Sequence, residues 1–163
     1  MPGMPKNRSN PVDATPAGRL VEASLHHVLG YQLAQATIVT DAVFAERVGT
    51  PFDLRPVEFT VLCLIHENPD VSAARLAKAL AVTAPNIAAW LERLERRELI
   101  RRTPHATDRR AQYLRTTTTG ATLASSATRS VIEGEQLALG NLSKGEQLIL
   151  IELLHKVAVS RGV

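Results

Sequence analysis

Residues 72–115 read SAARLAKALAVTAPNIAAWLERLERRELIRRTPHATDRRAQYLR, and this stretch decides the fold. Ser72 is a favourable N-cap for a short helix over residues 73–80. Only two residues separate that helix from Thr83, a second N-cap, which opens a helix over residues 84–97. Two helices joined by so short a connection predict a helix-turn-helix.

The second helix has one apolar face and one small, polar face. Its large apolar residues recur at i, i+3, i+4 and i+7, namely Ile87, Trp90, Leu91 and Leu94. The opposite face carries small and polar residues early and arginines late: Pro85, Asn86, Ala89, Glu92, Arg93 and Arg96. We expect the first face to pack inward and the second to meet a partner.

A basic hairpin follows these helices. Residues 99–102 and 111–115 are predicted as two short strands, and the loop between them carries Asp108-Arg109-Arg110 at its tip. Helix, turn, helix and hairpin is the order of a winged helix. We therefore predict a mainly α fold with a small β-hairpin wing, and a winged helix-turn-helix domain over residues 51–116.

Positive charge gathers in this region. The segment from Arg93 to Arg115 holds eight arginines and three acidic residues, a net charge of +5, whereas the whole chain carries +3. A basic stretch on a near-neutral body is typical of a surface that binds a polyanion. Arginine, with its planar fork, matches phosphates and guanine edges. The alternative is a charged face that is simply solvated.

The flanking segments predict pairing between two chains. Residues 1–16 contain little to bury and are predicted to be a disordered tail. Residues 17–50 show helical periodicity up to about Arg47, with a possible break near Gly30 and a stop at Gly49. Residues 117–160 form C-terminal helices, and the last begins at a Ser143–Glu146 capping box. These helices exceed what one small core needs, so we expect a homodimer.

Composition excludes several classes of protein. A single Cys forms no internal disulfide, which favours the cytoplasm. The longest apolar run has five residues, Val61–Ile65, so no membrane span is expected. We find no secretory signal, no catalytic motif and no trusted metal-ligand spacing, so neither an enzyme nor a cofactor is expected. Aromatic residues make up 4%, which disfavours binding to RNA or to single strands.

The stretch from residue 53 to residue 120 resembles the MarR family of transcription factors. The family's marks appear in order and at the family's distances: Leu54-Arg55 with Phe59, Leu76-Ala77, Arg93-Leu94-Glu95, Glu98-Leu99-Ile100, Asp108-Arg109-Arg110, and Thr116-Thr117 with Gly120. There are two departures. Glu98 replaces the usual glycine, whose left-handed conformation costs a non-glycine residue roughly 1 kcal/mol. Thr116 replaces the usual leucine under the wing.

The resemblance implies roles for individual residues. Helix N-termini suit phosphate oxygens, so Ser72 and Thr83 are expected near the DNA backbone. Asn86 is expected at a base edge in the major groove, with Pro85 and Ala89 small enough to let the helix sink in. Arg93 and Arg96 are expected at phosphates, with pairing to Glu92 or Glu95 as the alternative.

The wing-tip residues complete the expected DNA-binding set. Arg110 is expected at the minor groove, where a narrow groove concentrates negative potential, and Arg109 beside it belongs to the same DNA-binding set. Asp108 is expected to orient neighbouring arginines, so its removal should weaken binding although it deletes a negative charge. For every residue of the set, an ordinary capping or surface role is the alternative.

Members of the family often respond to a small aromatic or anionic effector. The resemblance places such a ligand between the dimer helices and the DNA-binding region, where Tyr31, Phe44 and His66 are candidates. Cys63 lies in an apolar run and is expected to pack rather than to sense oxidants.

The sequence thus predicts a homodimeric regulator, most simply a repressor, that binds palindromic double-stranded DNA. A winged helix used only for protein contact is the alternative.

Overall fold

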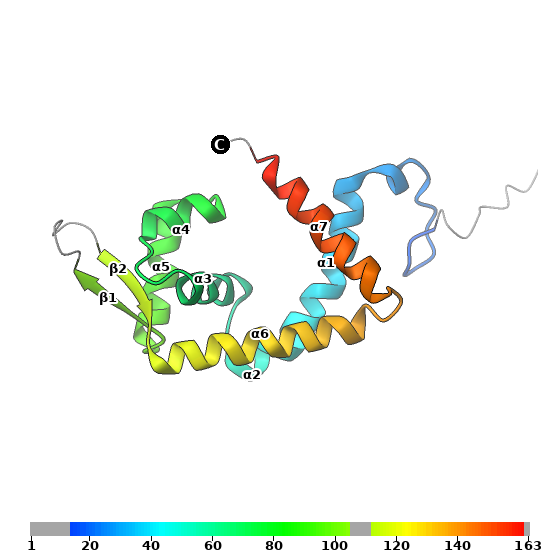
Figure 1. Cartoon of the computed structure of the whole chain (residues 1–163). Coiled ribbons are helices and arrows are strands. Elements are labelled where there is room, and N and C mark those ends of the chain that lie inside the picture. The colour runs from blue at the N-terminus through cyan, green and yellow to red at the C-terminus, as the bar shows by residue number, and fades with distance from the viewer. Residues whose placement is uncertain (1–13, 105–111, 162–163) are drawn as a thin grey trace, which may run out of the picture. The chain divides into compact units, whose positions relative to one another are not determined.

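The computed structural model describes residues 14–104 and 112–161. The chain divides into two compact units, one up to Ala42 and one from Val43 onward. Helices dominate, and the strands form a single antiparallel pair (Figure 1). The predicted fold class, mainly α with a β-hairpin wing, is confirmed.

The first unit is less regular than the sequence predicts. Ala14 pairs with Val21 in an isolated bridge, so the last residues of the predicted tail form a closed turn, whereas the rest of that tail lies outside the described residues. A 3-10 helix, η2, spans Ala23–His27, and helix α1 spans Leu29–Phe44. Val28 is extended between them, with φ −88° and ψ 107°. The expected break near Gly30 therefore falls two residues earlier.

The helical path does not stop at Gly49, and this prediction is wrong. A π-helical segment, η3 (Ala45–Gly49), leads directly into α2 (Thr50–Phe52). The path ends at Asp53, which adopts the left-handed conformation with φ 48°. Val48 and Leu54 are both buried, and this burial outweighs the weak helix preference of glycine.

The second unit contains the predicted helix-turn-helix. It comprises α3 (Pro56–Glu67), α4 (Ala73–Leu80) and α5 (Ala84–Arg96). The turn between α4 and α5 is made by Ala81 at φ 53°, with Val82 N–H donating to the Ala77 carbonyl. The predicted helix-turn-helix is confirmed.

The wing packs beside these helices. Strands β1 (Ile100–Pro104) and β2 (Gln112–Thr116) pair antiparallel, with Ile100 opposite Thr116. The strands are shifted by one or two residues from their predicted limits. Leu114 of β2 also bridges to Val71, just before α4, so the wing is joined to the helix-turn-helix by backbone hydrogen bonds.

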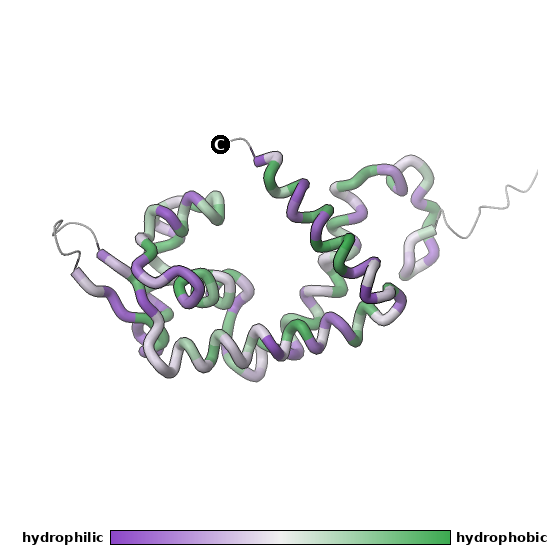
Figure 2. The backbone as a smooth tube through the Cα atoms, viewed as in Figure 1, coloured by the Kyte–Doolittle hydropathy of each residue, from purple (hydrophilic) through white to green (hydrophobic). Residues whose placement is uncertain are grey.

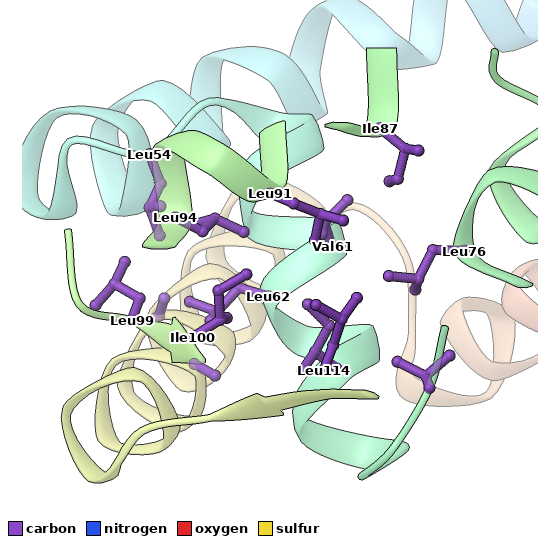
Figure 3. Packing of buried hydrophobic residues seen from close by; sticks show 14 of the residues in the cluster. Leu54, Val61, Leu62, Leu76, Ile87, Leu91, Leu94, Leu99, Ile100 and Leu114 are labelled. Atoms are coloured by element: carbon purple, nitrogen blue, oxygen red, sulfur yellow. The ribbon is translucent and has the colours of Figure 1, made fainter. Parts of the chain in front are cut away.

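One hydrophobic core holds the winged-helix head, which we define as residues 54–116 where described. Ile87, Leu91 and Leu94 of α5 are fully buried, as the sequence predicts, whereas Trp90 is only partly buried. Figure 3 shows them meeting side chains of α3, α4 and the hairpin. The opposite face of α5 remains at the surface.

Helix α6 (Thr118–Ala138) leaves the wing and crosses η3. Gly134 does not interrupt it: a Cβ there would lie 2.6 Å from Cγ of Arg47 and 2.8 Å from Cγ1 of Val43. The glycine therefore permits a close helix crossing.

Helix α7 (Lys144–Val159) begins at the predicted capping box, in which Ser143 N–H donates to Glu146 Oε2 at 2.7 Å. No residue of α7 is buried, although many are apolar (Figure 2). Among the described residues, no helix has the length and apolar character needed to cross a bilayer.

Candidate nucleic-acid interface

The outer face of α5 is small and exposed along its first two turns. Pro85, Asn86 and Ala89 are all exposed, and the Asn86 amide forms no hydrogen bond within the described parts of the chain. Thr83 stands at the N-cap, but its hydroxyl makes no capping hydrogen bond. That hydroxyl and the first N–H groups of α5 are therefore open to an external acceptor.

Helix α4 presents a second N-terminus. Ser72 Oγ accepts a hydrogen bond from Arg75 N–H at 3.3 Å, which confirms Ser72 as the predicted N-cap. Its hydroxyl proton is not used in that contact, so Ser72 can cap the helix and still donate to a phosphate oxygen.

The arginine cluster is largely committed to contacts within the protein. Of the six arginines of the cluster that the structure describes, four bind other groups of the chain: Arg93, Arg97, Arg102 and Arg115. Arg96 and Arg101 are exposed and form no ion pair among the described residues. The positive surface available to a polyanion is therefore much smaller than the run of arginines suggests.

Arg93 is the clearest departure from expectation. Its Nε lies 2.9 Å from Oε1 of Glu58, and a terminal nitrogen lies 3.9 Å from Asp53. The alternative partners on its own helix, Glu92 and Glu95, are not used. Arg96, one turn further along, has its guanidinium in solvent and remains a candidate for a phosphate.

Arg115 fastens the wing to the loop before α4. Its guanidinium donates from Nε to Oδ1 of Asp70 at 2.6 Å and from a terminal nitrogen to Oδ2. The hydrogen bonds and charge of Arg115 hold the pKa of Asp70 below its usual range. Neither residue is therefore free for DNA.

Glu98 confirms the strain that the sequence predicts. It adopts φ 56° at the end of α5, in the region that favours glycine. Its carbonyl accepts a hydrogen bond from Thr117 Oγ1 at 2.7 Å, which ties the start of α6 to the start of β1. Gly120 packs against the same place, since a Cβ there would lie 1.8 Å from the Leu99 carbonyl oxygen.

The wing tip, with Asp108, Arg109 and Arg110, lies outside the described residues. The strands that carry it are in place on either side, ending at Pro104 and beginning again at Gln112.

The candidate effector residues do not form one site within either unit. Tyr31 lies in the first unit, where partial desolvation and then the negative charge of Glu22 raise its pKa. Phe44 and His66 lie in the second unit, where the Phe44 ring packs on Phe59 with centroids 5.6 Å apart. Neither residue lines the open hollow of about 420 Å³ beside Phe52 and the first turns of α6.

Two further expectations concern sulfur and metals. Cys63 Sγ lies 3.5 Å from Thr128 Oγ1, and burial raises the pKa of the thiol, so the reactive thiolate is disfavoured as expected. Residues 14–104 and 112–161 contain no cluster of three metal-ligating side chains.

Sequence reasoning missed three acidic partners: Asp53, Glu58 and Asp70. Glu58 had one local signal, because it stands at the third helical position and accepts the Arg55 N–H at 3.1 Å, as in a capping box. Its complete burial had none.

The chain was compared with known proteins, and the matches agree on one family. The model described as "MarR family" matches residues 54–111. The repressor NicR of Pseudomonas putida, named as an HTH-type transcriptional repressor, is 30% identical over 91% of this chain and 90% of its own length. The chain belongs to the MarR family. It is therefore a member of a family of transcriptional regulators, not of enzymes.

Solved MarR-family structures agree with the fold. The transcriptional repressor CouR, bound to a 23-mer DNA duplex, is 30% identical and superposes with a TM-score of 0.78, covering 85% of this chain and 98% of CouR. BpsR of Bordetella bronchiseptica, whose DNA binding is regulated by 6-hydroxynicotinic acid, is 25% identical with a TM-score of 0.70, covering 80% and 92% of the two chains.

Proposed function

We propose that this MarR-family chain is a repressor that binds a palindromic DNA operator as a homodimer and is released by a small aromatic acid. The observation that carries DNA recognition is the outer face of α5. It is exposed, small and polar at its start, and ends at Arg96, which forms no ion pair among the described residues. A helix of this shape fits the major groove, with Asn86 at an adenine edge.

Backbone contacts complete the DNA-binding surface that we propose. Ser72 and Thr83 donate to phosphates from two helix N-termini, and Arg96 supplies charge beside them. Pro85 and Ala89 allow close approach. Arg110 reaches the minor groove from the wing tip, with Arg109 beside it and Asp108 orienting both, as the family resemblance implies.

The dimer rests on the exposed apolar residues of α7. Eight large hydrophobic residues of that helix are exposed: Leu148, Ile149, Leu150, Ile151, Leu153, Leu154, Val157 and Val159. So contiguous an apolar surface marks an interaction site. A second copy of the chain fits the function, because one winged helix reads few base pairs, whereas a dimer reads two half-sites about 34 Å apart.

The test uses the DNA that flanks this reading frame. Footprinting locates the operator, and fluorescence anisotropy measures affinity as salt is raised. We expect log affinity to fall steeply and linearly with log salt concentration. Asn86→Ala removes one base contact from each half-site, and each bidentate contact is worth about 1–3 kcal/mol, so operator binding should weaken by roughly 30-fold or more. Glu133→Gln, an exposed change on α6, is the matched control.

Two results would contradict the proposal. Affinity that does not change with salt would point to protein contact instead. Sedimentation of a stable monomer at micromolar concentration would remove the dimer.

The effector is tested separately. BpsR responds to 6-hydroxynicotinic acid, so we expect an aromatic carboxylate of that kind to release this protein from its operator. 6-Hydroxynicotinate is the probe, and its uncharged amide is the control. Release by both compounds, or by neither, would contradict recognition of an aromatic acid.

A further inference from the structure

The head contains one fully buried carboxylate. Glu58, in the first turn of α3, has no exposed surface, unlike every other acidic residue of the head that the structure describes. Its Oε2 accepts the Arg55 N–H at 3.1 Å. Its Oε1 lies 2.9 Å from Arg93 Nε without accepting a directed hydrogen bond, so their attraction is that of an ion pair.

A second arginine stands at the C-cap of α5, one turn after Arg93. Arg97 donates to the Phe52 carbonyl at 2.9 Å and also to the Asp53 carbonyl. Asp53 in turn lies 3.9 Å from Arg93 and 4.0 Å from Arg97. The last two turns of α5 are thus attached to the corner between α2 and α3 by two successive arginines.

These contacts differ in kind from the core beneath α5. Ile87, Leu91 and Leu94 are held by the hydrophobic effect, which has no direction and tolerates small rotations of a helix. The pair is not a strong source of stability, because desolvation of Glu58 opposes the attraction, but it strongly disfavours arrangements in which that buried carboxylate is left unpaired. It therefore restricts where α5 can lie.

We propose that Arg93 and Glu58 form a positioning pair that sets the orientation of α5, so that Arg93 acts on DNA recognition without touching DNA. The inference rests on the proposed function. Asn86 lies about two turns before Arg93, and a small rotation of the helix would move it away from a base edge. Arg96, whose side chain is exposed, is the phosphate contact of this end of the helix.

The salt dependence of binding separates the two roles. Each phosphate contact contributes about 0.9 to the slope of log affinity against log salt. Arg96→Gln removes one phosphate contact from each subunit of the proposed dimer, so it should lower that slope by about 1.8 and weaken the operator and a scrambled duplex alike. Arg93→Gln should leave the slope unchanged and reduce the ratio of operator to scrambled-duplex affinity by about tenfold or more.

Two further variants sharpen the test. Glu58→Gln should reduce the same ratio, and the double variant with Arg93→Gln should lose no more than either single change, because the residues act as one unit. Arg93→Lys keeps the charge but has no nitrogen at the position of Nε, so the ratio of operator to scrambled-duplex affinity should stay below that of the unchanged protein. A phosphate contact would survive that substitution.

To exclude unfolding as the cause of weaker binding, DNA affinity is measured far below the unfolding temperature of each variant. If a single change prevents folding, the paired replacement Glu58→Leu with Arg93→Met removes both charges and should fold while losing the ratio. A slope that falls by about 1.8 in Arg93→Gln, with Glu58→Gln unchanged, overturns the positioning role alone. Failure of the unchanged protein to bind duplex DNA overturns the proposed function as well.

Discussion

The winged-helix head and helix α7 are both rich in large apolar residues, but only the head covers them. Leu62, Ile65 and Leu94 have no exposed surface, whereas Ile149 and Ile151 of α7 are 56% and 64% exposed. In the head, each apolar face meets another element of the same chain (Figure 3). The comparison teaches that similar apolar residues stabilise the fold in one region and stay exposed in the other, where we propose that they serve association.

The pattern along each helix fits this difference. Helix α5 keeps its apolar residues on one side, as a helix does when it lies on a core. Helix α7 carries them on more than one side, which suits a helix packed between several others. Burying a leucine, isoleucine or valine contributes about 1.5–3 kcal/mol, so the eight such residues of α7 would supply a strong drive for assembly.

The largest expected effect compares a glycine of α6 that packs against the head with a glycine of α7. Gly120→Ala would place a Cβ 1.8 Å from the Leu99 carbonyl oxygen, and backbone cannot move aside cheaply. We expect a loss of at least about 3 kcal/mol in unfolding free energy, measured by urea denaturation. Gly145→Ala in α7 meets no atom within 4 Å and is the control. Similar losses in both would show that the head is not packed as described.

The second prediction compares leucines. Leu94→Ala should cost about 2–5 kcal/mol of unfolding free energy at any protein concentration, because it leaves a cavity in the head. Leu153→Ala, at a residue 52% exposed, should weaken self-association, so its effect on stability should depend on protein concentration. Sedimentation equilibrium with denaturation at two concentrations measures both. A concentration-independent loss at Leu153 would contradict the role of α7 in assembly.

The third prediction concerns strain inside the head. Glu98→Gly should raise the unfolding free energy by about 1 kcal/mol, because glycine adopts φ 56° without steric cost. Glu98→Ala, which keeps a Cβ, should give no such gain. Thermal unfolding of both variants against the unchanged protein is the measurement, and equal melting temperatures would argue against strain at this position.

The smallest expected effect concerns two exposed ion pairs. Arg115 lowers the pKa of Asp70 in the folded state, so the pair stabilises the fold above the ordinary Asp pKa of about 3.9 and is lost as pH falls through the folded value. Asp70→Asn should therefore lower the urea midpoint at neutral pH. In acid, the midpoints of the variant and of the unchanged protein should become equal. Glu152→Gln, which breaks the α7 pair with Lys156, is the control.

Local signals predicted most of the fold. Helix periodicity in α5, the N-cap at Ser72, the capping box at Ser143 and the left-handed Glu98 all depend on residues within a few positions of one another. The end of the first long helix was mispredicted at Gly49, because burial of Val48 and Leu54 overrides local preference there.

The candidate site was predicted less completely. The exposed start of α5 followed from periodicity alone, but the availability of its arginines did not. Arg93 meets a partner 35 positions earlier in the chain, and Arg115 one 45 positions earlier. The spacing of the arginines does not predict these acidic partners, because each pair forms only when α3, α5 and the wing have packed together.

By itself, the sequence determined that this protein is a winged helix with apolar flanking helices, because caps, turns and periodicities act over one or two helical turns. Only the tertiary structure decided which charges remain free, because a guanidinium binds whichever acid the packed core brings within about 4 Å. That decision separates Arg96, open to a polyanion, from Arg93, held by a buried carboxylate.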